Sequence, residues 1–323
     1  AARLGCRGAL CTMDLDAVAH MPCNPAIGGT AKGHLVREVD ALGGLMGEAI
    51  DATGLQFKLL NRSRGAAVQS PRAQADRRAY SSWMRARLAA VPSIDWVAGE
   101  VVALRLEGGR VAGVTLADGR ILACRAVVVT AGTFLDAVMH VGPRQRRGGR
   151  AGAAPATDLA RSLRAMGFEW TRLKTGTPPR IDARTIDFSL TEAQHGSDVP
   201  LWFSRAGRAG RVERLDLPPL AVYPGRTEGW RPQLSCYLVQ TNAEGHDLIA
   251  RNVDRSPMFN GSIQGIGPRY CPSIEDKVMR FREKQSHGLF LEPEGWRTTE
   301  VYVQGANTSL PHDVQLAFLR TIP

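Results

Sequence analysis

The 323-residue sequence predicts an α/β fold, and three observations support that prediction. Arg7–Thr12 has the pattern of a short strand, and a helix is expected soon after it, over His34–Leu42. From Ser93 to Thr130 the pattern changes to strands. Within that stretch, Ala126–Val129 is an apolar run of the kind found in strands that are buried on both faces.

The N-terminal elements resemble part of a βαβ unit. Ala1–Gly5 resembles the end of a helix, and the strand Arg7–Thr12 follows it. In a dinucleotide-binding βαβ unit, the G-x-G-x-x-G turn lies about twenty residues before the end of such a strand. The sequence begins after that point, so we expect a truncated N-terminus. Residues 20–33 form a loop rich in glycine and proline before the predicted helix.

The middle of the chain contains a predicted helix and a predicted β-meander. Ser70-Pro71 supplies a capping hydroxyl followed by proline, which predicts a helix from there to about Ala90. Asp118-Gly119 is a hairpin turn motif between the strands Val111–Leu116 and Arg120–Ala123. The basic side of the predicted helix is more typical of a solvated face than of a binding one, and it carries Arg72, Arg77, Arg78, Arg85 and Arg87.

The order of these elements indicates a domain organisation. A βαβ start, a β-meander and a buried strand ending in the small residues Thr130–Thr133 follow one another in flavoproteins with two dinucleotide-binding domains, which is an analogy of fold. We therefore predict a first domain over residues 1–140 and an inserted α+β domain over residues 141–204 and 231–323. Residues 205–230 show no periodicity and are expected to form an exposed insertion. Beyond them we expect a strand at Tyr237–Gln240 and a helix at Ser273–Arg282.

The composition limits the class of protein. With 44% hydrophobic and 22% charged residues, the chain is neither disordered nor fibrous. It has no apolar run long enough for a membrane span and no charged-then-apolar leader, so we expect a cytoplasmic protein. The net charge of +10 favours a polyanion such as nucleic acid. The arginine, alanine, glycine and proline content is also what G+C-rich coding produces, so charge alone leaves both interpretations open.

Several kinds of site are excluded by spacing. The six cysteines contain no C-x-x-C pair, and the seven histidines contain no H-E-x-x-H, so no metal site is predicted. Lys32 follows glycines, but Gly29–Gly33 is not a P-loop. The sequence contains no G-x-S-x-G elbow, so a serine hydrolase is not supported.

Two cysteines lie where chemistry is plausible. Cys271 lies beside Arg269 and two residues before a helix that Ser273 and Asp276 are expected to cap, and both the helix end and the guanidinium favour a thiolate. A buried loop cysteine is an equally good interpretation of that segment. Cys23 lies in the stiff loop Pro-Cys-Asn-Pro, where a structural role is the simpler interpretation from the loop alone.

Eight strings spread along nearly the whole chain show a family resemblance. They are Cys23–Gly29, Lys32–Gly44, Pro71–Asp76, Gly132–Leu135, Gly148–Gly152, Leu173–Asp182, Gly267–Phe281 and Thr308–Pro311. These strings resemble the GidA/MnmG family, the FAD-dependent tRNA uridine 5-carboxymethylaminomethyl modification enzymes. Only Arg205–Trp230 departs from the family pattern.

The resemblance implies a fold and an activity. The fold would be an FAD/NAD(P)-binding, Rossmann-like flavoprotein of the glutathione-reductase type. The activity would add a carboxymethylaminomethyl or aminomethyl group at carbon 5 of uridine 34 in tRNA, together with the MnmE GTPase. Methylenetetrahydrofolate would supply one carbon, glycine or ammonium the amine, and NADH the reducing equivalents. A homodimer within a larger complex is also implied, as are an N-terminal glycine turn and a C-terminal helical domain, both outside this sequence.

The resemblance also assigns site residues. Cys23 and Cys271 match the two cysteines that the family places near the flavin. Val101 and Ala156 match FAD contacts, although the family usually has serine at the second position, and we add Thr130, Gly132 and Thr133 from the small-residue turn. The segment matched to NAD consists of Gly267, Pro268, Arg269, Tyr270, Cys271, Pro272, Ser273, Ile274, Glu275, Asp276, Lys277, Val278, Met279, Arg280 and Phe281.

Three alternatives remain open from the sequence. The first is the folate- and FAD-dependent tRNA uracil-5-methyltransferase, in which we would not expect the full Gly267–Phe281 string. The second is a truncated, non-catalytic module that binds tRNA without flavin. A pyridine-nucleotide disulfide reductase is the least favoured, because it needs paired redox cysteines.

Overall fold

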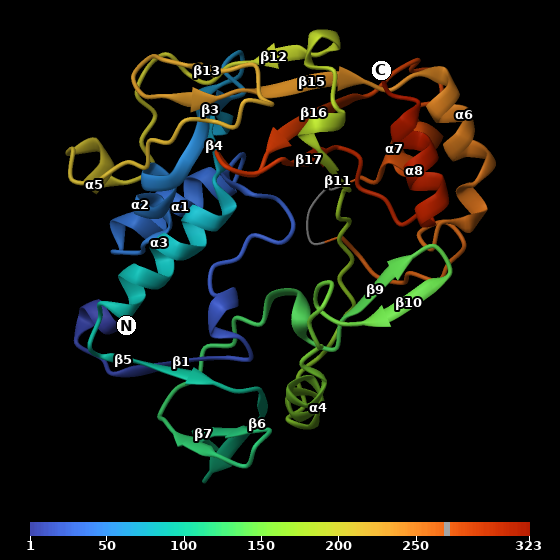
Figure 1. Ribbon diagram of the computed structural model, residues 1–323. Coiled ribbons are helices and arrows are strands. Elements are labelled where there is room, and N and C mark those ends of the chain that lie inside the picture. Colours follow the sequence, from blue (N-terminus) through green and yellow to red (C-terminus); the bar gives the residue numbers. More distant parts are fainter. Residues whose placement is uncertain (268–271) are drawn as a thin grey trace.

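The computed structural model describes residues 1–267 and 272–323, and it has the mixed α/β content that the sequence predicts. The upper layer in Figure 1 is a five-stranded antiparallel sheet of order β11-β17-β16-β15-β12. Helices α6, α7 and α8 lie at one end of this sheet (Figure 1). The bounds are β11 Arg180–Asp182, β12 Glu192–Gln194, β15 Cys236–Gln240, β16 Gly288–Pro293, β17 Glu300–Gln304, α6 Ala243–Arg251, α7 Ile274–Arg280 and α8 His312–Arg320.

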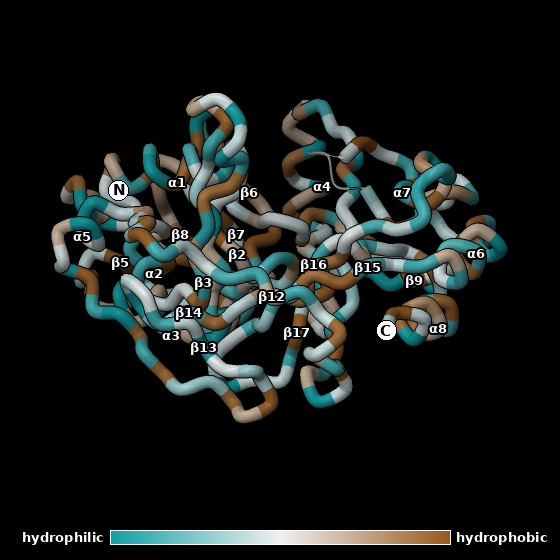
Figure 2. Tube along the Cα trace, turned by 90° about the horizontal axis from the view of Figure 1, so that it is seen from above, coloured by the Kyte–Doolittle hydropathy of each residue, from teal (hydrophilic) through white to brown (hydrophobic). Residues whose placement is uncertain are grey.

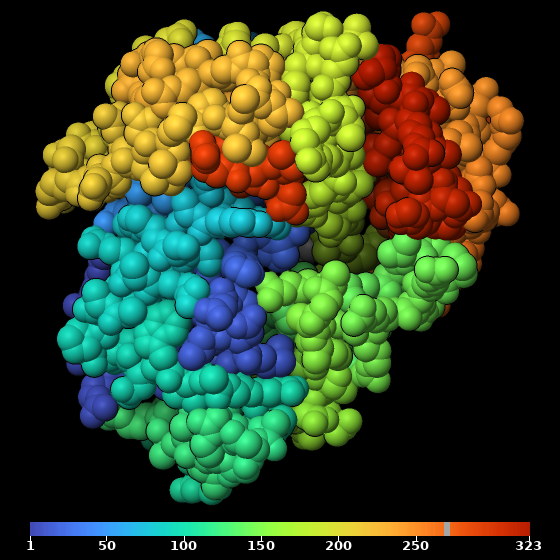
Figure 3. All heavy atoms as spheres, viewed as in Figure 1, coloured from blue at the N-terminus to red at the C-terminus, as the bar shows by residue number. Residues whose placement is uncertain are grey.

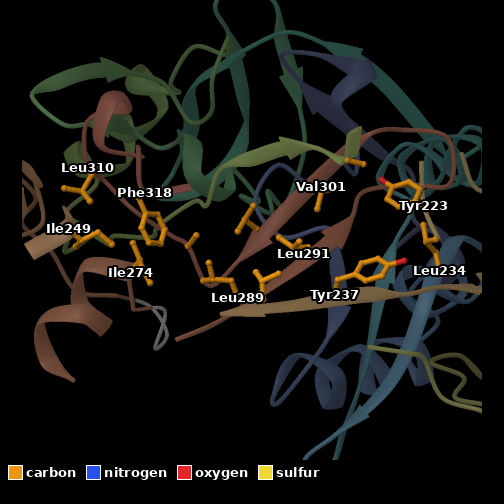
Figure 4. Close-up of a cluster of buried hydrophobic side chains, with 14 of the residues drawn as sticks. Tyr223, Leu234, Tyr237, Ile249, Ile274, Leu289, Leu291, Val301, Leu310 and Phe318 are labelled. Atoms are coloured by element: carbon orange, nitrogen blue, oxygen red, sulfur yellow. The ribbon is translucent and has the colours of Figure 1, made fainter. Parts of the chain in front are cut away.

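The main hydrophobic core lies between this sheet and these helices (Figure 4). Along β16, Leu289 and Leu291 are at most 5% exposed whereas Phe290 is 38% exposed, which is the alternation of a strand with one face on the core. Burial of one such aliphatic side chain stabilises the fold by about 1.5–3 kcal/mol. The helices contribute Ile249, Ile274, Val278, Val314 and Phe318 to the same cluster.

A second, three-stranded sheet has the order β2-β4-β3 and packs with α1, α2 and α3. Phe57 on β3 is fully buried in the cluster that joins them, and its ring meets that of Trp230 edge-on. The predicted helix at His34–Leu42 is confirmed as α1. The bounds are β2 Ala26–Gly28, β3 Gly54–Leu60, β4 Ser70–Ala75, α1 Lys32–Ala41, α2 Met46–Thr53 and α3 Arg77–Ala89.

The predicted helix start at Ser70-Pro71 is wrong. Those residues begin β4, the central strand of the sheet, which pairs with β2 on one side and β3 on the other. The helix begins at Arg77 instead, after Asp76, whose carboxylate accepts a hydrogen bond from the Ala79 amide at 2.9 Å. Arg72, predicted to be solvated, contacts the buried carboxylate of Glu292 at 2.6 Å. Pairing with distant strands overrides the local capping preference.

The lower part of the molecule contains two further sheets. β1 (Gly8–Thr12) pairs in parallel with β5 (Ile94–Ala98), so the predicted first strand is confirmed. The strands β6 (Val101–Glu107), β7 (Arg110–Leu116) and β8 (Ile121–Ala123) form the predicted antiparallel meander, and Asp118-Gly119 makes the β7–β8 turn.

The predicted buried strand at Ala126–Val129 is wrong. The segment has no strand pairing in the part of the chain that the structure describes, and Val128 is 83% exposed and Val129 41% exposed. Its apolar sequence suits a strand inside a sheet, but β1 and β5 form a sheet of only two strands here. Without a neighbouring strand, its backbone groups cannot form a ladder.

Residues 205–230 differ from the exposed, unstructured insertion that we expected. They include the short helix α5 (Arg205–Arg208), and Tyr223 is only 4% exposed, with its hydroxyl donating to the Thr298 carbonyl. Leu215, Leu217, Leu220 and Val222 pack against the main core. These apolar residues follow no regular period, so their burial left no pattern in the sequence. The division of the chain into domains stays a prediction.

The remaining elements complete the structure. Figure 2, viewed from above, shows α1 and α5 at the opposite end of the molecule from α6 and α8. No helix within residues 1–267 and 272–323 is both long and apolar enough for a membrane span. The remaining bounds are β9 Val138–Val141, β10 Arg144–Arg147, α4 Thr157–Ala165, β13 Arg226–Thr227 and β14 Gln233–Leu234, with 3₁₀ turns at Ala2–Leu4, Leu15–Ala17, Ala66–Val68, Gly132–Phe134, Ala183–Thr185, Phe188–Leu190 and Val253–Arg255.

Candidate functional site

Cys23 lies at the β11–β17 edge of the five-stranded sheet. Its sulfur is 3.9 Å from the Gly176 carbonyl oxygen and 4.0 Å from the hydroxyl of Tyr302, which belongs to β17. The next residue, Asn24, donates its side-chain amide to Gln304 Oε1 at 3.0 Å. The Pro-Cys-Asn-Pro loop therefore contacts the five-stranded sheet through side chains near the end of β17.

An arginine from the edge strand β11 holds the same loop. Arg180 Nη2 donates to the carbonyl oxygens of Pro22 and Cys23, at 2.8 and 3.0 Å. Arg180 Nε donates to Glu294 at 3.0 Å, and the guanidinium lies 4.9 Å from the centre of the Tyr302 ring. The Glu294 side chain is 1% exposed and also pairs with Arg77 at the start of α3. One buried carboxylate thus connects the first turn of a helix, a strand and the cysteine loop.

Buried groups surround the sulfur on the sheet side. Tyr302 is 2% exposed, and burial raises the pKa of its hydroxyl well above the ordinary value, with the nearby Cys23 and Glu292 side chains adding to the effect. Two strands away in the same sheet, at the start of β15, Cys236 is 3% exposed, and burial raises the pKa of its thiol to about 12. A thiol with such a pKa is inert at neutral pH. Cys236 is therefore a structural cysteine.

The structure brings together the two predicted flavin contacts Val101 and Ala156. Both belong to one apolar cluster, in which Leu159 and Leu163 of α4 face β6. Ala156 is 6% exposed and occupies the N-cap position of α4, where no side chain caps the helix. Its amide donates to the Phe134 carbonyl at 2.8 Å. This contact places Ala156 next to the 3₁₀ turn that contains Gly132 and Thr133.

The backbone of this region can be approached closely, as a dinucleotide requires. Gly132 and Gly152 have φ values of +57° and +81°, and a Cβ added at either would meet nothing within 4 Å. Open glycines of this kind let a pyrophosphate reach the main chain. Thr130 is exposed, and Thr133 donates its hydroxyl to the Gly149 carbonyl at 2.8 Å. The residues that are present therefore fit an FAD molecule.

Arg150 follows the Gly149 carbonyl that Thr133 contacts, and it reaches the residues just before the cysteine loop. Arg150 Nη1 lies 3.2 Å from His20 Nδ1, just before Pro22 and Cys23, and it also pairs with Asp14. Partial burial, followed by the charge of Arg150, lowers the pKa of His20 and favours its neutral form. The surface in Figure 3 is hollowed where the blue N-terminal residues, the green residues beyond β8 and the upper layer meet.

The second predicted cysteine, Cys271, lies outside the described residues, as do Pro268, Arg269 and Tyr270. Both flanks of that segment meet the stretch that carries Gly176. Ile266 exchanges backbone hydrogen bonds with Arg172 and Lys174. The Ile274 amide donates to the Asn307 carbonyl at 2.7 Å, and a Cβ added at Gly176 would be 3.0 Å from Asn307 Cβ.

Helix α7, in the predicted NAD segment, begins as expected. Ser273 and Asp276 form a reciprocal capping box. Ile274 and Val278 lie in the main core, and the buried Glu275 accepts hydrogen bonds from Ser256 and the Ser309 amide at 3.1 Å each. Those three side chains therefore anchor the helix. The role of Gly267, Pro272, Lys277, Met279, Arg280 and Phe281 towards NAD stays a prediction.

Sequence reasoning missed Arg180, Tyr302 and Glu294. Arg180 follows two prolines that stiffen its approach to β11, which was a local indication of a fixed side chain. Tyr302, on β17, and Glu294, just after β16, had no such indication, because they lie far from Cys23 in the sequence. Lys32 donates to the Ala26 carbonyl at 2.9 Å, which agrees with the rejection of a P-loop. No group of His, Cys, Asp or Glu suited to a metal ion occurs among the described residues.

Comparisons with known proteins agree with this geometry. The model of the family "Glucose inhibited division protein A" matches residues 1–323. The proteins named "tRNA uridine 5-carboxymethylaminomethyl modification enzyme MnmG" from Roseiflexus sp. (strain RS-1) and Chloroflexus aurantiacus are each 54% identical to this chain, all of which aligns with 51% of each protein. Two crystal forms of Aquifex aeolicus GidA give TM-scores of 0.86 and 0.87, at 43% and 41% identity, over 98% and 100% of this chain and 50% and 49% of theirs.

These comparisons establish the fold class and the family. The predicted FAD/NAD(P)-binding, Rossmann-like class is confirmed by the GidA structures. The chain spans about half the length of the curated relatives that it matches. With a family match over every residue and relatives above 50% identity, the chain belongs to the glucose-inhibited division protein A (GidA/MnmG) family.

Proposed function

We propose that this chain is part of an FAD-dependent enzyme that modifies carbon 5 of the wobble uridine of tRNA with a carboxymethylaminomethyl or aminomethyl group. The family membership and the printed names of the relatives support this proposal. Within the chain, the observation that carries it is the placement of Cys23. A half-buried thiol faces a buried tyrosine, and an arginine holds the backbone of its loop. Just before that loop, His20 contacts Arg150, which adjoins the region that suits a flavin.

The chemistry explains why such an enzyme needs a thiol. Carbon 5 of uracil is a poor nucleophile until another group adds to carbon 6. A thiolate is suited to that addition, since it is nucleophilic near neutral pH and can leave again afterwards. In our proposal the sulfur of Cys23 or Cys271 bonds to carbon 6 of the uracil. The other thiol acts as a general acid or base.

The proposed reaction also requires cofactors. When bound, FAD would supply the chemistry of one-carbon transfer, with methylenetetrahydrofolate as the donor and NADH as the reductant. In this chain, Val101 and Ala156 would bury the apolar part of the flavin, while Thr130, Gly132 and Thr133 would bring main-chain groups to it. The segment from Gly267 to Phe281 would contact NADH, but not through Ile274, Glu275 or Val278, which are buried in the fold.

The partners are proposed from charge and from the family. The net charge of +10 suits tRNA, whose phosphates would contact exposed arginines. The family resemblance adds the MnmE GTPase and a homodimer within a larger complex. We place the protein in the cytoplasm, where tRNA is modified.

The proposal is tested by the nucleosides of tRNA. The chain, expressed with whatever sequence flanks it in its gene, is introduced into a bacterial strain that lacks its own family member. We expect 5-carboxymethylaminomethyluridine or 5-aminomethyluridine at the wobble position by liquid chromatography and mass spectrometry. Cys23→Ser and Cys271→Ser variants should abolish the product while bound flavin, read from its visible spectrum, stays in place. Cys6→Ser, at an exposed thiol, is the matched control.

Other products would support the alternatives. A 5-methyluridine product would indicate the tRNA uracil-5-methyltransferase. Salt-sensitive binding of tRNA with neither flavin nor product would indicate a non-catalytic module. Full activity of the Cys23→Ser variant would contradict the role that we give to this thiol.

A further inference from the structure

The cysteine loop is fixed through its backbone by a single guanidinium group. Arg180 Nη2 donates to two successive carbonyl oxygens, those of Pro22 and Cys23, at 2.8 and 3.0 Å. Proline at position 22 limits the backbone freedom of the loop still further. A planar guanidinium loses less rotamer freedom per hydrogen bond than an ammonium does, which suits it to this task.

Arg180 is itself held on two sides. Its Nε donates to Glu294, whose side chain is 1% exposed, and its guanidinium lies over the ring of Tyr302 at 4.9 Å. Both partners are buried between the sheets. The position of the Cys23 backbone is therefore set by groups that cannot move without opening the core.

The sulfur of Cys23 has two polar neighbours of opposite character. The carbonyl oxygen of Gly176, at 3.9 Å, can only accept a hydrogen bond, so it suits the protonated thiol. The hydroxyl of Tyr302, at 4.0 Å, keeps its proton at neutral pH and can donate it, so it suits the thiolate. Each protonation state of the sulfur thus has one partner.

We propose that Tyr302 is the hydrogen-bond donor to the Cys23 thiolate and that Arg180 is the positioning residue that aims the sulfur at it. The proposal rests on the proposed function only in giving this thiol a reaction to perform. It makes the ionisation of Cys23 depend on a tyrosine 279 residues away in the chain. Neither Arg180 nor Tyr302 needs to contact the substrate for this role.

The test is the rate at which iodoacetamide alkylates each cysteine, followed by peptide mass spectrometry from pH 6 to pH 10. The quantity compared is the rate at pH 7 divided by the plateau rate at high pH, because access to the thiol cancels in this ratio. The exposed Cys6 serves as an internal reference, and the buried Cys236 should stay unreacted in the folded protein.

For Cys23 we expect Tyr302→Phe to lower this ratio by about three- to tenfold, the effect of losing one hydrogen bond of ordinary net strength. Arg180→Gln should lower it to a similar extent, and the double variant should fall no further, because both changes remove the same contact. Arg180→Lys should not restore the ratio, since an ammonium keeps the positive charge but lacks the planar set of guanidinium donors. The matched controls, Tyr237→Phe in the same sheet and Arg184→Gln in an exposed pair with Asp182, should leave the ratio unchanged.

Several outcomes would overturn the inference. An unchanged ratio in Tyr302→Phe would show that Tyr302 does not donate a hydrogen bond to the thiolate. A ratio in Arg180→Lys equal to that of the original chain would show that Arg180 acts through its charge and not by positioning the loop. A double variant whose loss is the product of the single losses would show two separate effects. Thermal melts check that each variant is folded. The measurement needs neither flavin nor tRNA, so a tyrosine-dependent ratio in a protein that leaves tRNA unmodified would refute the proposed function and uphold this inference.

Discussion

Asp51, in helix α2, is a buried carboxylate whose effect on stability depends on pH. It is fully buried and accepts hydrogen bonds from the amides of Phe203 and Ser204 and from the Ser204 hydroxyl, at 2.9, 2.8 and 2.7 Å. Burial raises its pKa from 3.8 to about 6, and the hydrogen bonds only partly oppose that shift. Between these two values the folded state keeps a proton that the unfolded state has lost.

Stability should therefore fall as the pH rises from about 4 to about 6, by up to about 3 kcal/mol from this group. Across that range the urea midpoint of the original chain should fall relative to that of Asp51→Asn. Carboxylates whose pKa is lowered, such as Asp136 and Asp182, act alike on both proteins. The exposed Asp198 provides the control, since Asp198→Asn should leave the dependence of the urea midpoint on pH unchanged. Parallel slopes for Asp51→Asn and the original chain would disprove the prediction.

Val101 tests the proposed flavin site at the level of one side chain. A carboxylate in the apolar cluster formed with Ala156 and Phe134 would cost several kcal/mol to desolvate, so Val101→Asp should reduce bound FAD by about tenfold or more. Flavin content is read from the visible spectrum after gel filtration with added FAD. Val111→Asp, on the adjacent strand but outside that cluster, should retain the flavin. Equal flavin in the two variants would argue against the site.

At this scale the sequence offered a candidate for the reactive group but not its surroundings. Cys23 was a candidate because its loop matches a family string. Its partners Arg180 and Tyr302 lie 157 and 279 residues away, so no local pattern could join them to it. The burial of Asp51 was equally hidden, because it depends on a turn from Phe203 folding over α2.

Helix α4 has an N-cap without a side-chain hydrogen bond, and this is a local defect of one element. Ala156 occupies the cap position, where serine would accept a hydrogen bond from an amide in the first turn. Ala156→Ser should raise the free energy of unfolding by about 1 kcal/mol. The control, Ala165→Ser at the end of the same helix, should lower it by a few tenths. Both follow from denaturant titrations, and a lower midpoint for Ala156→Ser would show that the site cannot accept the hydroxyl.

Elements were predictable where their determinants are local. The capping box of Ser273 and Asp276 and the turn Asp118-Gly119 each need only a few adjacent residues, and both are confirmed. Ser70-Pro71 has an equally good local pattern for a helix start, yet it begins the central strand of a sheet. The energy of two ladders exceeds that of one cap, and the neighbouring strands were not visible from residue 70.

The whole molecule carries an excess of ten positive charges, and this should govern the tRNA binding that we propose. Each phosphate contact releases counterions, so binding of tRNA should weaken by roughly tenfold or more between 50 and 200 mM salt. Fluorescence anisotropy with labelled tRNA measures this. An uncharged crowding polymer at equal osmolarity controls for other solute effects. An affinity independent of salt would show that the positive charge reflects composition and not recognition.

The exposed valines that follow β8 also affect how the protein behaves at high concentration. Val128 and Val129 are adjacent β-branched side chains with no strand beside them among the described residues, and Val128 is 83% exposed. An apolar, unpaired backbone of this kind is a template for a strand from another molecule, and natural proteins protect such segments with a lysine or a proline. Self-association should therefore begin at this segment, and Val128→Lys is the substitution that would keep the chain soluble for the measurements above.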